Sequence, residues 1–370
     1  MSLIQSTAAL PKGQIVRWIV PAAVYCLCST TPGFRIPGLW ARQINPPQVR
    51  HRQYAAKPPK WRKPPEGLLF SQEDVPPLEL WEAGVASFKP EGLTPEACRD
   101  AATQYCSIAI NTLSNWKGRL ERDYGIDNYT LHCMGVILTH FPEVKFGRLG
   151  WHMFKTASDL NYDPSTVSMM DFLSTLKSRG PESERQLKLI TPRFEKILRS
   201  GDPEALTVQG KILLMRIKRQ EALGFFDRAI RAAALKEQST GTPTAGSVTA
   251  TVSAPADRAP RWPSEAGCYM TRAAILMELG RIEEAKEALK VAALELDIPA
   301  AYHLLSLAMP EGSQEQEEYL LKAAVSGITQ AFPHLARLEA TKAIALDPGD
   351  PRRKDHHIMA SQWDILANSQ

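Results

Sequence analysis

The residues best suited to bind a metal ion are concentrated in the run Asp355-His356-His357, which directly follows three basic residues. Carboxylate and imidazole groups are ordinary zinc ligands, and a closed zinc site needs about four of them. No second cluster in the sequence supplies the missing ligands. We therefore interpret this run as the exposed start of a helix.

A second group of potential ligands contains His132, Cys133 and His140, with His152 as a further candidate. His132 and His140 are eight residues apart, or about two turns of one helix. Such loose spacing rarely makes a metal site, and structural histidines in the core or on the surface are favoured.

The sequence contains none of the common catalytic motifs. There is no Gly-rich phosphate loop, no G-x-S-x-G elbow and no H-E-x-x-H helix. Cys98, Cys106, Cys133 and Cys268 are irregularly spaced, which favours reduced cysteines in or near a core. We predict that the chain is not an enzyme and binds no cofactor.

Basic residues form the third candidate site. One predicted helical hairpin carries a cluster of positive charge, formed by Arg216, Lys218, Arg219, Arg228 and Arg231. Such a face can contact RNA phosphates. The simpler interpretation is a solvated face whose charge is balanced by nearby glutamates, and we favour it while keeping RNA binding as the alternative.

The segment 1–65 differs sharply from the rest of the chain. It contains ten Lys or Arg and no acid, whereas the remainder carries 34 Lys or Arg against 40 Asp or Glu. A basic, acid-free, Ser- and Ala-containing start is typical of a mitochondrial presequence. Arg52, Tyr54 and Ala55 resemble a matrix-peptidase processing site. We predict a presequence over residues 1–54 and a matrix protein; the alternative is a basic tail on a cytosolic protein.

Helical patterns begin after a Pro-rich segment, residues 55–77, that we expect to be disordered. Apolar residues then recur at three- and four-residue steps, and no segment alternates with period two. The predicted helices between residues 78 and 201 are 78–88, 94–117, 128–141, 149–160, 163–179 and 182–200, the last broken near Pro192. Asp202 and Pro203 are expected to open the next helix after Gly201 stops the preceding one.

Residues 202–236 form a predicted helical hairpin, and a similar unit returns within residues 264–348. Between them, residues 237–263 are small and polar, which predicts a disordered insertion. Residues 349–370 are expected to form a C-terminal helix or tail. The first unit has small and large packing residues at steps of three, nine, four and three, and the second repeats these steps. The positions are Gly210, Leu213, Ala222, Phe226 and Ala229, then Ala273, Leu276, Ala285, Leu289 and Ala292.

This spacing resembles the tetratricopeptide repeat. Ala323 and Ala324, which follow a lysine and precede a Gly turn, look more like the related Sel1 repeat, and Ala343 to Pro348 resembles a tetratricopeptide repeat end. The resemblance implies an all-α fold in which antiparallel helix pairs stack into a right-handed superhelix. It also implies a concave face that binds other proteins.

We therefore expect a mitochondrial protein–protein interaction scaffold that assembles or stabilises a respiratory-chain complex. Its partners would be other mitochondrial proteins, bound on the concave face, with peripheral association at the inner membrane. No segment after the predicted presequence is apolar enough to span a membrane. The alternative is an RNA- or ribosome-associated factor in mitochondrial gene expression.

Overall fold

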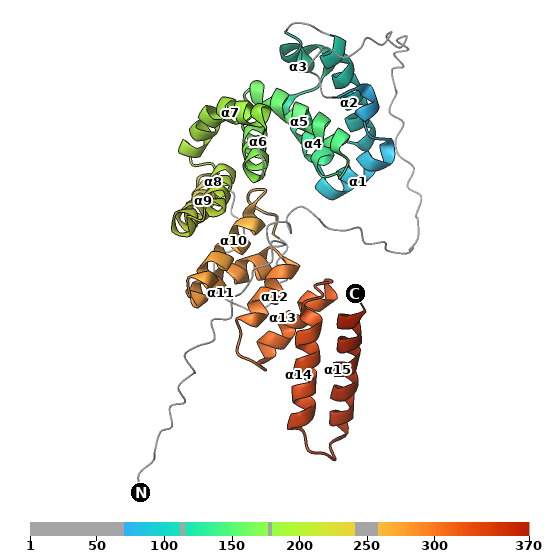
Figure 1. The fold of residues 1–370 in the computed structure, drawn as a ribbon, viewed down its shortest axis with the longest axis vertical. Helices are drawn as coiled ribbons and strands as arrows, with labels where there is room; N and C mark the ends of the chain where they lie inside the picture. The colour runs from blue at the N-terminus through green and yellow to red at the C-terminus, as the bar shows by residue number, and fades with distance from the viewer. Residues whose placement is uncertain (1–69, 112–114, 177–179, 241–257, 370) are drawn as a thin grey trace. The chain divides into compact units, whose positions relative to one another are not determined.

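The structure is a computed structural model that describes residues 70–111, 115–176, 180–240 and 258–369. The chain divides into two units, Met1–Trp61 and Arg62–Gln370, and every described residue belongs to the second unit. Within the described ranges all regular elements are helical and no strand occurs (Figure 1). The all-α prediction is confirmed. The predicted processing residues Arg52, Tyr54 and Ala55 lie outside the described residues.

The first part of the second unit contains seven α-helices among its described residues, together with two short 3-10 turns. They are η2 (Gln72–Asp74), α1 (Leu78–Phe88), α2 (Pro95–Asn111), η3 (Lys117–Arg119), α3 (Leu120–Tyr124), α4 (Asn128–Thr139), α5 (Val144–Asp159), α6 (Asp163–Thr175) and α7 (Pro181–Arg199).

The remaining elements continue to the end of the chain, with one π-helical segment that extends α11. They are α8 (Pro203–Met215), α9 (Arg219–Thr240), α10 (Glu265–Glu278), α11 (Ile282–Lys290), η4 (Val291–Glu295), α12 (Pro299–Leu307), α13 (Gln314–Val325), α14 (Ala331–Ala345) and α15 (Pro351–Asn368).

Local sequence signals explain where α7 ends and α8 begins. Gly201 adopts a positive φ of 79°, a conformation that glycine takes without steric cost. The Asp202 carboxylate then accepts a hydrogen bond of 3.0 Å from the Ala205 amide, and Pro203 occupies the first turn of α8. These are the stop and the cap that the sequence predicted.

The predicted break at Pro192 is wrong, because α7 continues through this proline. Pro192 lacks an amide hydrogen and is exposed, so water can hydrogen-bond the carbonyl left free one turn earlier. The opposite face of the helix is buried through Ile190, Phe194 and Ile197. Packing of that face therefore outweighs the local defect.

Other boundaries also differ from the prediction. Helix α2 is described to Asn111, and Trp116 already lies outside it, although the prediction continued to residue 117; α5 begins at Val144 rather than at 149. The segment predicted as insertion is ordered at both ends, since α9 continues to Thr240 and Trp262 is buried in the C-terminal core. Residues 241–257 lie outside the described residues.

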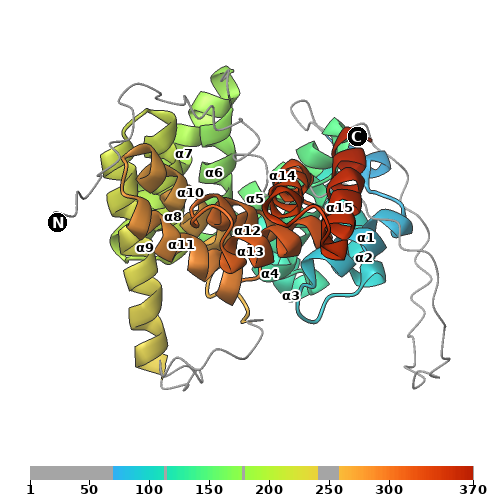
Figure 2. The ribbon, with the colours of Figure 1, turned by 90° about the horizontal axis from the view of Figure 1, so that it is seen from below.

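Helices pack mainly against their neighbours in sequence, most extensively in the pairs α4–α5, α8–α9 and α14–α15. Figures 1 and 2 both show α8 beside α9 and α14 beside α15. Buried side chains form an N-terminal core from Phe70 to Ala157, a middle core from Phe154 to Ile212 and a C-terminal core from Leu206 to Leu335. None of the described helices is long and apolar enough to cross a membrane.

Candidate functional site

The packing positions of the α8–α9 hairpin are buried and interlock closely. Gly210 of α8 lies directly against the ring of Phe226 of α9, which is fully buried. A Cβ atom added at Gly210 would lie 2.7 Å from the Phe226 Cε1 atom, which is closer than real Cβ contacts. The absence of a side chain at Gly210 therefore allows the aromatic ring to sit between the two helices.

The equivalent positions in α10 and α11–η4 are also buried. Ala273, Leu276, Ala285, Leu289 and Ala292 are at most 1% exposed. Ala323, Ala324 and Ala343 are likewise buried in α13 and α14.

Pro348 differs from the other predicted packing positions, because it is exposed. Helix α14 ends at Ala345, so Pro348 lies in the turn before α15 and outside both helix faces. Pro351, three residues later, is the proline that opens α15.

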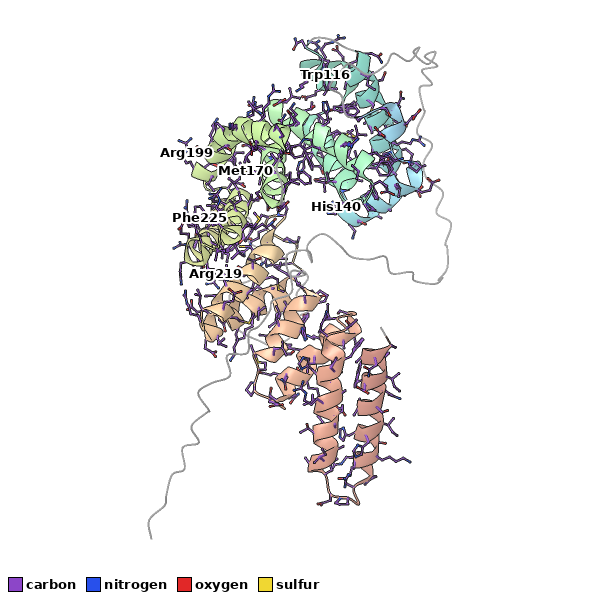
Figure 3. The ribbon with its side chains drawn as sticks, viewed as in Figure 1. Trp116, His140, Met170, Arg199, Arg219 and Phe225 are labelled. Atoms are coloured by element: carbon purple, nitrogen blue, oxygen red, sulfur yellow. The ribbon has the colours of Figure 1, made fainter. Side chains whose placement is uncertain are left out.

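The predicted basic residues of the α8–α9 hairpin are all exposed, but neighbouring groups engage most of them. Lys218 pairs with Glu221 at 2.9 Å, and Arg219 pairs with Glu278 of α10. Arg228 lies over the ring of Phe225 at 4.9 Å, and the Arg231 side chain donates to a backbone carbonyl one turn earlier. Figure 3 labels Arg219 and Phe225 on this hairpin. The positive charge is therefore divided among separate local contacts.

The histidines considered as metal ligands have protein partners instead. His132 Nδ1 lies 3.0 Å from Ser165 Oγ, and His152 Nδ1 lies 2.7 Å from the Tyr105 hydroxyl. His140 lies at the other end of α4 and donates to the carbonyl of Val136. His356 lies 2.6 Å from the Glu339 carboxylate of α14. In the part of the chain that the structure describes, no group of three His, Cys, Asp or Glu is arranged to hold a metal ion.

A groove of about 530 Å³ lies where α4, α6, α9, the α7–α8 turn and the segment before α10 meet. We call it the inner groove. Its wall is largely apolar, and its rim carries acidic and basic side chains. The apolar residues are Val136, Pro164, Val167, Ile197, Pro203, Ala233, Trp262 and Pro263, and the charged ones are Asp163, Asp202, Glu204, Lys236, Glu237 and Arg261.

Glu204 joins the groove wall to the segment before α10. Its carboxylate accepts hydrogen bonds from the Ser264 amide at 2.8 Å and from the Ser264 hydroxyl at 2.6 Å, across 60 residues of sequence. Burial raises the pKa of Glu204 above its usual value. The same environment keeps His132 neutral at physiological pH, since burial lowers its pKa to about 4.

Arg258, Arg261 and Glu265 form an ion cluster that fixes the segment before α10. Both terminal nitrogens of the Arg258 guanidinium group bind the Glu265 carboxylate, at 2.8 and 2.9 Å, and Arg261 binds it from its amide and its side chain. Burial alone would raise the pKa of Glu265, but these hydrogen bonds outweigh it and hold the pKa below the usual value. The cluster therefore remains ionised and holds Trp262 in place.

Trp262 is one of the groove residues that the sequence prediction missed. The residue is 5% exposed, and its Nε1 atom donates to the Thr207 hydroxyl at 3.2 Å. A tryptophan has too much apolar surface to suit a solvated linker. Its presence beside Pro263, at the end of an otherwise small and polar segment, was the sequence signal that this end is packed. Around the groove that it lines, four acids face two bases, so acidic groups predominate.

Comparisons of the chain with protein-family models, curated proteins and solved structures found no match. The likeness to tetratricopeptide and Sel1 repeats therefore rests on the spacing of the packing residues.

Proposed function

We propose that this chain is a binding scaffold, not an enzyme, and that its inner groove holds a segment of a partner protein. The observation that carries this proposal is the groove itself, an apolar wall with a charged rim between helices of successive pairs. Such concave sites are typical of ligand and peptide binding. In helical-repeat proteins, stacked pairs present surfaces of this kind to extended or helical partners.

The groove chemistry defines the partner segment. Asp202 already pairs with Lys236, and Glu237 pairs with Arg261, which leaves Asp163 exposed on the rim. A segment with two or three apolar side chains and a nearby lysine or arginine would complement this arrangement.

We further propose that the helix pairs form a right-handed superhelix and that the protein works in the mitochondrial matrix. There it would assist assembly or stability of a respiratory-chain complex, with peripheral association at the inner membrane. The basic, acid-free composition of the segment 1–65 supports the location. The repeat-like spacing supports the superhelix, and the use of such scaffolds in complex assembly supports the role.

The scaffold proposal is tested by filling the groove. Ser168 is a half-buried residue of α6 in the groove wall, and Ser168→Trp should place a ring where the partner binds. Ser87→Trp, on the exposed side of α1, is the matched control. Partners would be identified by affinity purification from mitochondria with the wild-type chain, then measured with both variants.

We expect Ser168→Trp to weaken partner binding by at least about tenfold, equivalent to ~1.4 kcal/mol, and Ser87→Trp to leave it unchanged. If both variants bind the partner equally well, the groove is not the binding site. A tagged chain found outside mitochondria would overturn the location.

RNA binding is the second candidate, and exposure of Arg216, Arg228 and Arg231 is the observation that favours it. Their simultaneous replacement by Gln should leave helicity unchanged, because all three are exposed. Loss of salt-sensitive RNA recovery in this variant, with partner-protein binding intact, would favour the RNA function over the scaffold.

A further inference from the structure

Helix α15 packs on α14 through one face only. Its half-buried residues recur at three- and four-residue steps: Arg353, His356, Ala360, Trp363 and Ala367. The ring of Trp363 stacks on Phe332 at a centroid distance of 5.7 Å, and His356 lies beside the buried Glu339. These contacts fix which side of α15 is turned away from α14.

The opposite side of α15 carries four large apolar residues that are exposed to solvent. Ile358, Met359, Ile365 and Leu366 are 46, 41, 63 and 44% exposed, and we call this set the outer face. Elsewhere in the described residues, exposed apolar side chains of this size are spread over many elements. Grouped apolar side chains that are open to water mark interaction sites, so the outer face indicates a further contact.

The outer face has the symmetry that a second copy requires. Its four residues lie three and four positions before and after Gln362. If a second α15 packs antiparallel about a two-fold axis at Gln362, Ile358 meets Leu366 and Met359 meets Ile365, and each pair occurs twice. Such mutual pairing of one surface with itself defines an isologous interface.

The charges of α15 favour the same arrangement. Three bases, Arg352 to Lys354, lie in its first turn, beside the positive end of the helix dipole, where positive charge is unfavourable. Arg352 is paired with Asp350 at 2.7 Å, so Arg353 and Lys354 carry this argument. In the antiparallel pair with its axis at Gln362, Lys354 lies two residues beyond Asn368, the last helical residue of the other α15, where the end of that helix dipole is negative. The basic residues 1–65 of the same chain would instead bring like charge to this end, so a second copy is the better occupant.

We propose that the chain forms a two-fold symmetric dimer through antiparallel packing of the α15 outer faces. With the axis at Gln362, residues 356–368 of the two helices overlap over about 20 Å, which places this single helix pair among small and weak interfaces. The dimer therefore depends on protein concentration, with assembly in the micromolar range.

Sedimentation equilibrium of the full chain tests the assembly. Ile365→Lys places two charges in the interface by symmetry, and we expect the dimer dissociation constant to rise about 100-fold. Leu235→Lys is the matched control, since Leu235 of α9 is 64% exposed and lies outside the outer face. Far-UV circular dichroism of both variants should equal that of the wild type.

Cysteine cross-linking tests the antiparallel register. Gln362→Cys lies on the proposed axis and should form a disulfide-linked dimer under oxidation. Lys354→Cys should not, because its two copies would be separated by roughly 24 Å along the helices. The wild-type chain, treated identically, controls for the native cysteines.

A wild-type chain that is monomeric at all concentrations overturns the proposal. Protection of α15 from hydrogen exchange in that monomer would assign the outer face to another segment of the same chain. Cross-linking through Lys354→Cys, with or without cross-linking through Gln362→Cys, would overturn the antiparallel arrangement.

Discussion

The N-terminal and C-terminal cores of this molecule are built on different principles. Alanine is the commonest residue among the buried side chains of the C-terminal core, whereas those of the N-terminal core include only Ala102, Ala109 and Ala157. Small residues let helix backbones approach at the same positions in successive pairs, so a spacing pattern recurs. Large residues interlock individually, and each contact has its own geometry.

The N-terminal core also depends on polar groups placed among aromatic rings. The Tyr105 hydroxyl lies 2.7 Å from both His152 Nδ1 and Thr156 Oγ1, and Trp116 stacks on the His152 ring. Such contacts join α2 to α5 without any repeating pattern. This difference between small-residue packing and individual large-residue contacts explains why repeats are visible in the C-terminal half of the sequence and faint in the N-terminal half.

The largest expected effects come from removing one ring in each core. Trp81→Ala and Phe226→Ala both empty fully buried positions, and each should reduce the free energy of unfolding by ~3–5 kcal/mol. Hydrogen exchange should show that the two variants destabilise different helices. Trp81→Ala should increase exchange in α1–α5 and leave α10–α14 protected, since repeat stability spreads through neighbours. Uniform loss of protection in both variants would show that the two cores unfold as one unit.

The polar N-terminal core should also be sensitive to acid. Burial lowers the pKa of His152 to about 3, with Lys117 and Lys155 adding to the shift. The unfolded chain takes up this proton near pH 6.5 and the folded chain only near pH 3, so stability falls as the pH drops through this range. One such group changes the unfolding free energy by ~1.4 kcal/mol per pH unit.

His152→Gln should therefore flatten the dependence of unfolding free energy on pH, as measured by urea denaturation between pH 7 and 4.5. His132 and His303, whose pKa values burial lowers to about 4, contribute to the remaining slope. An unchanged slope in the variant would contradict a neutral, buried His152.

Close packing of small residues in the α8–α9 hairpin is tested by adding one methyl group. Gly210→Ala should reduce the unfolding free energy by ~1–3 kcal/mol, because the new Cβ meets the Phe226 ring. Gly224→Ala, in α9 with open space around it, should raise stability by ~0.5–1 kcal/mol. Thermal denaturation of both variants gives the comparison, and equal shifts would contradict the tight α8–α9 contact.

The smallest expected effect concerns the exposed ion pair that joins the first hairpin to α10. Arg219→Gln removes the contact with Glu278 and should lower the unfolding free energy by ~0–1 kcal/mol, less at high salt. Lys218→Gln, whose partner Glu221 lies within the same hairpin, is the control. A loss above ~2 kcal/mol would show that these surface pairs, rather than apolar packing, join the repeat units.

Several features followed directly from the order of residues, because they depend on near neighbours. The Asp202 cap and the Gly201 stop need only the adjacent turn, and the spacing from Gly210 to Ala229 reflects the period of the helix itself. Pro192 shows the limit of such reasoning. Its local preference was overridden by burial of Ile190, Phe194 and Ile197 on the other side of α7.

The sequence alone determined the helices, the small-residue packing positions and the contrast between a basic start and a mildly acidic remainder. Only the tertiary structure decided where the inner groove lies and which side of α15 is left uncovered. The groove depends on contacts such as Glu204 with Ser264 and His132 with Ser165, which join residues 60 and 33 positions apart. No local period encodes such pairs, because they form only when separate helices are packed together.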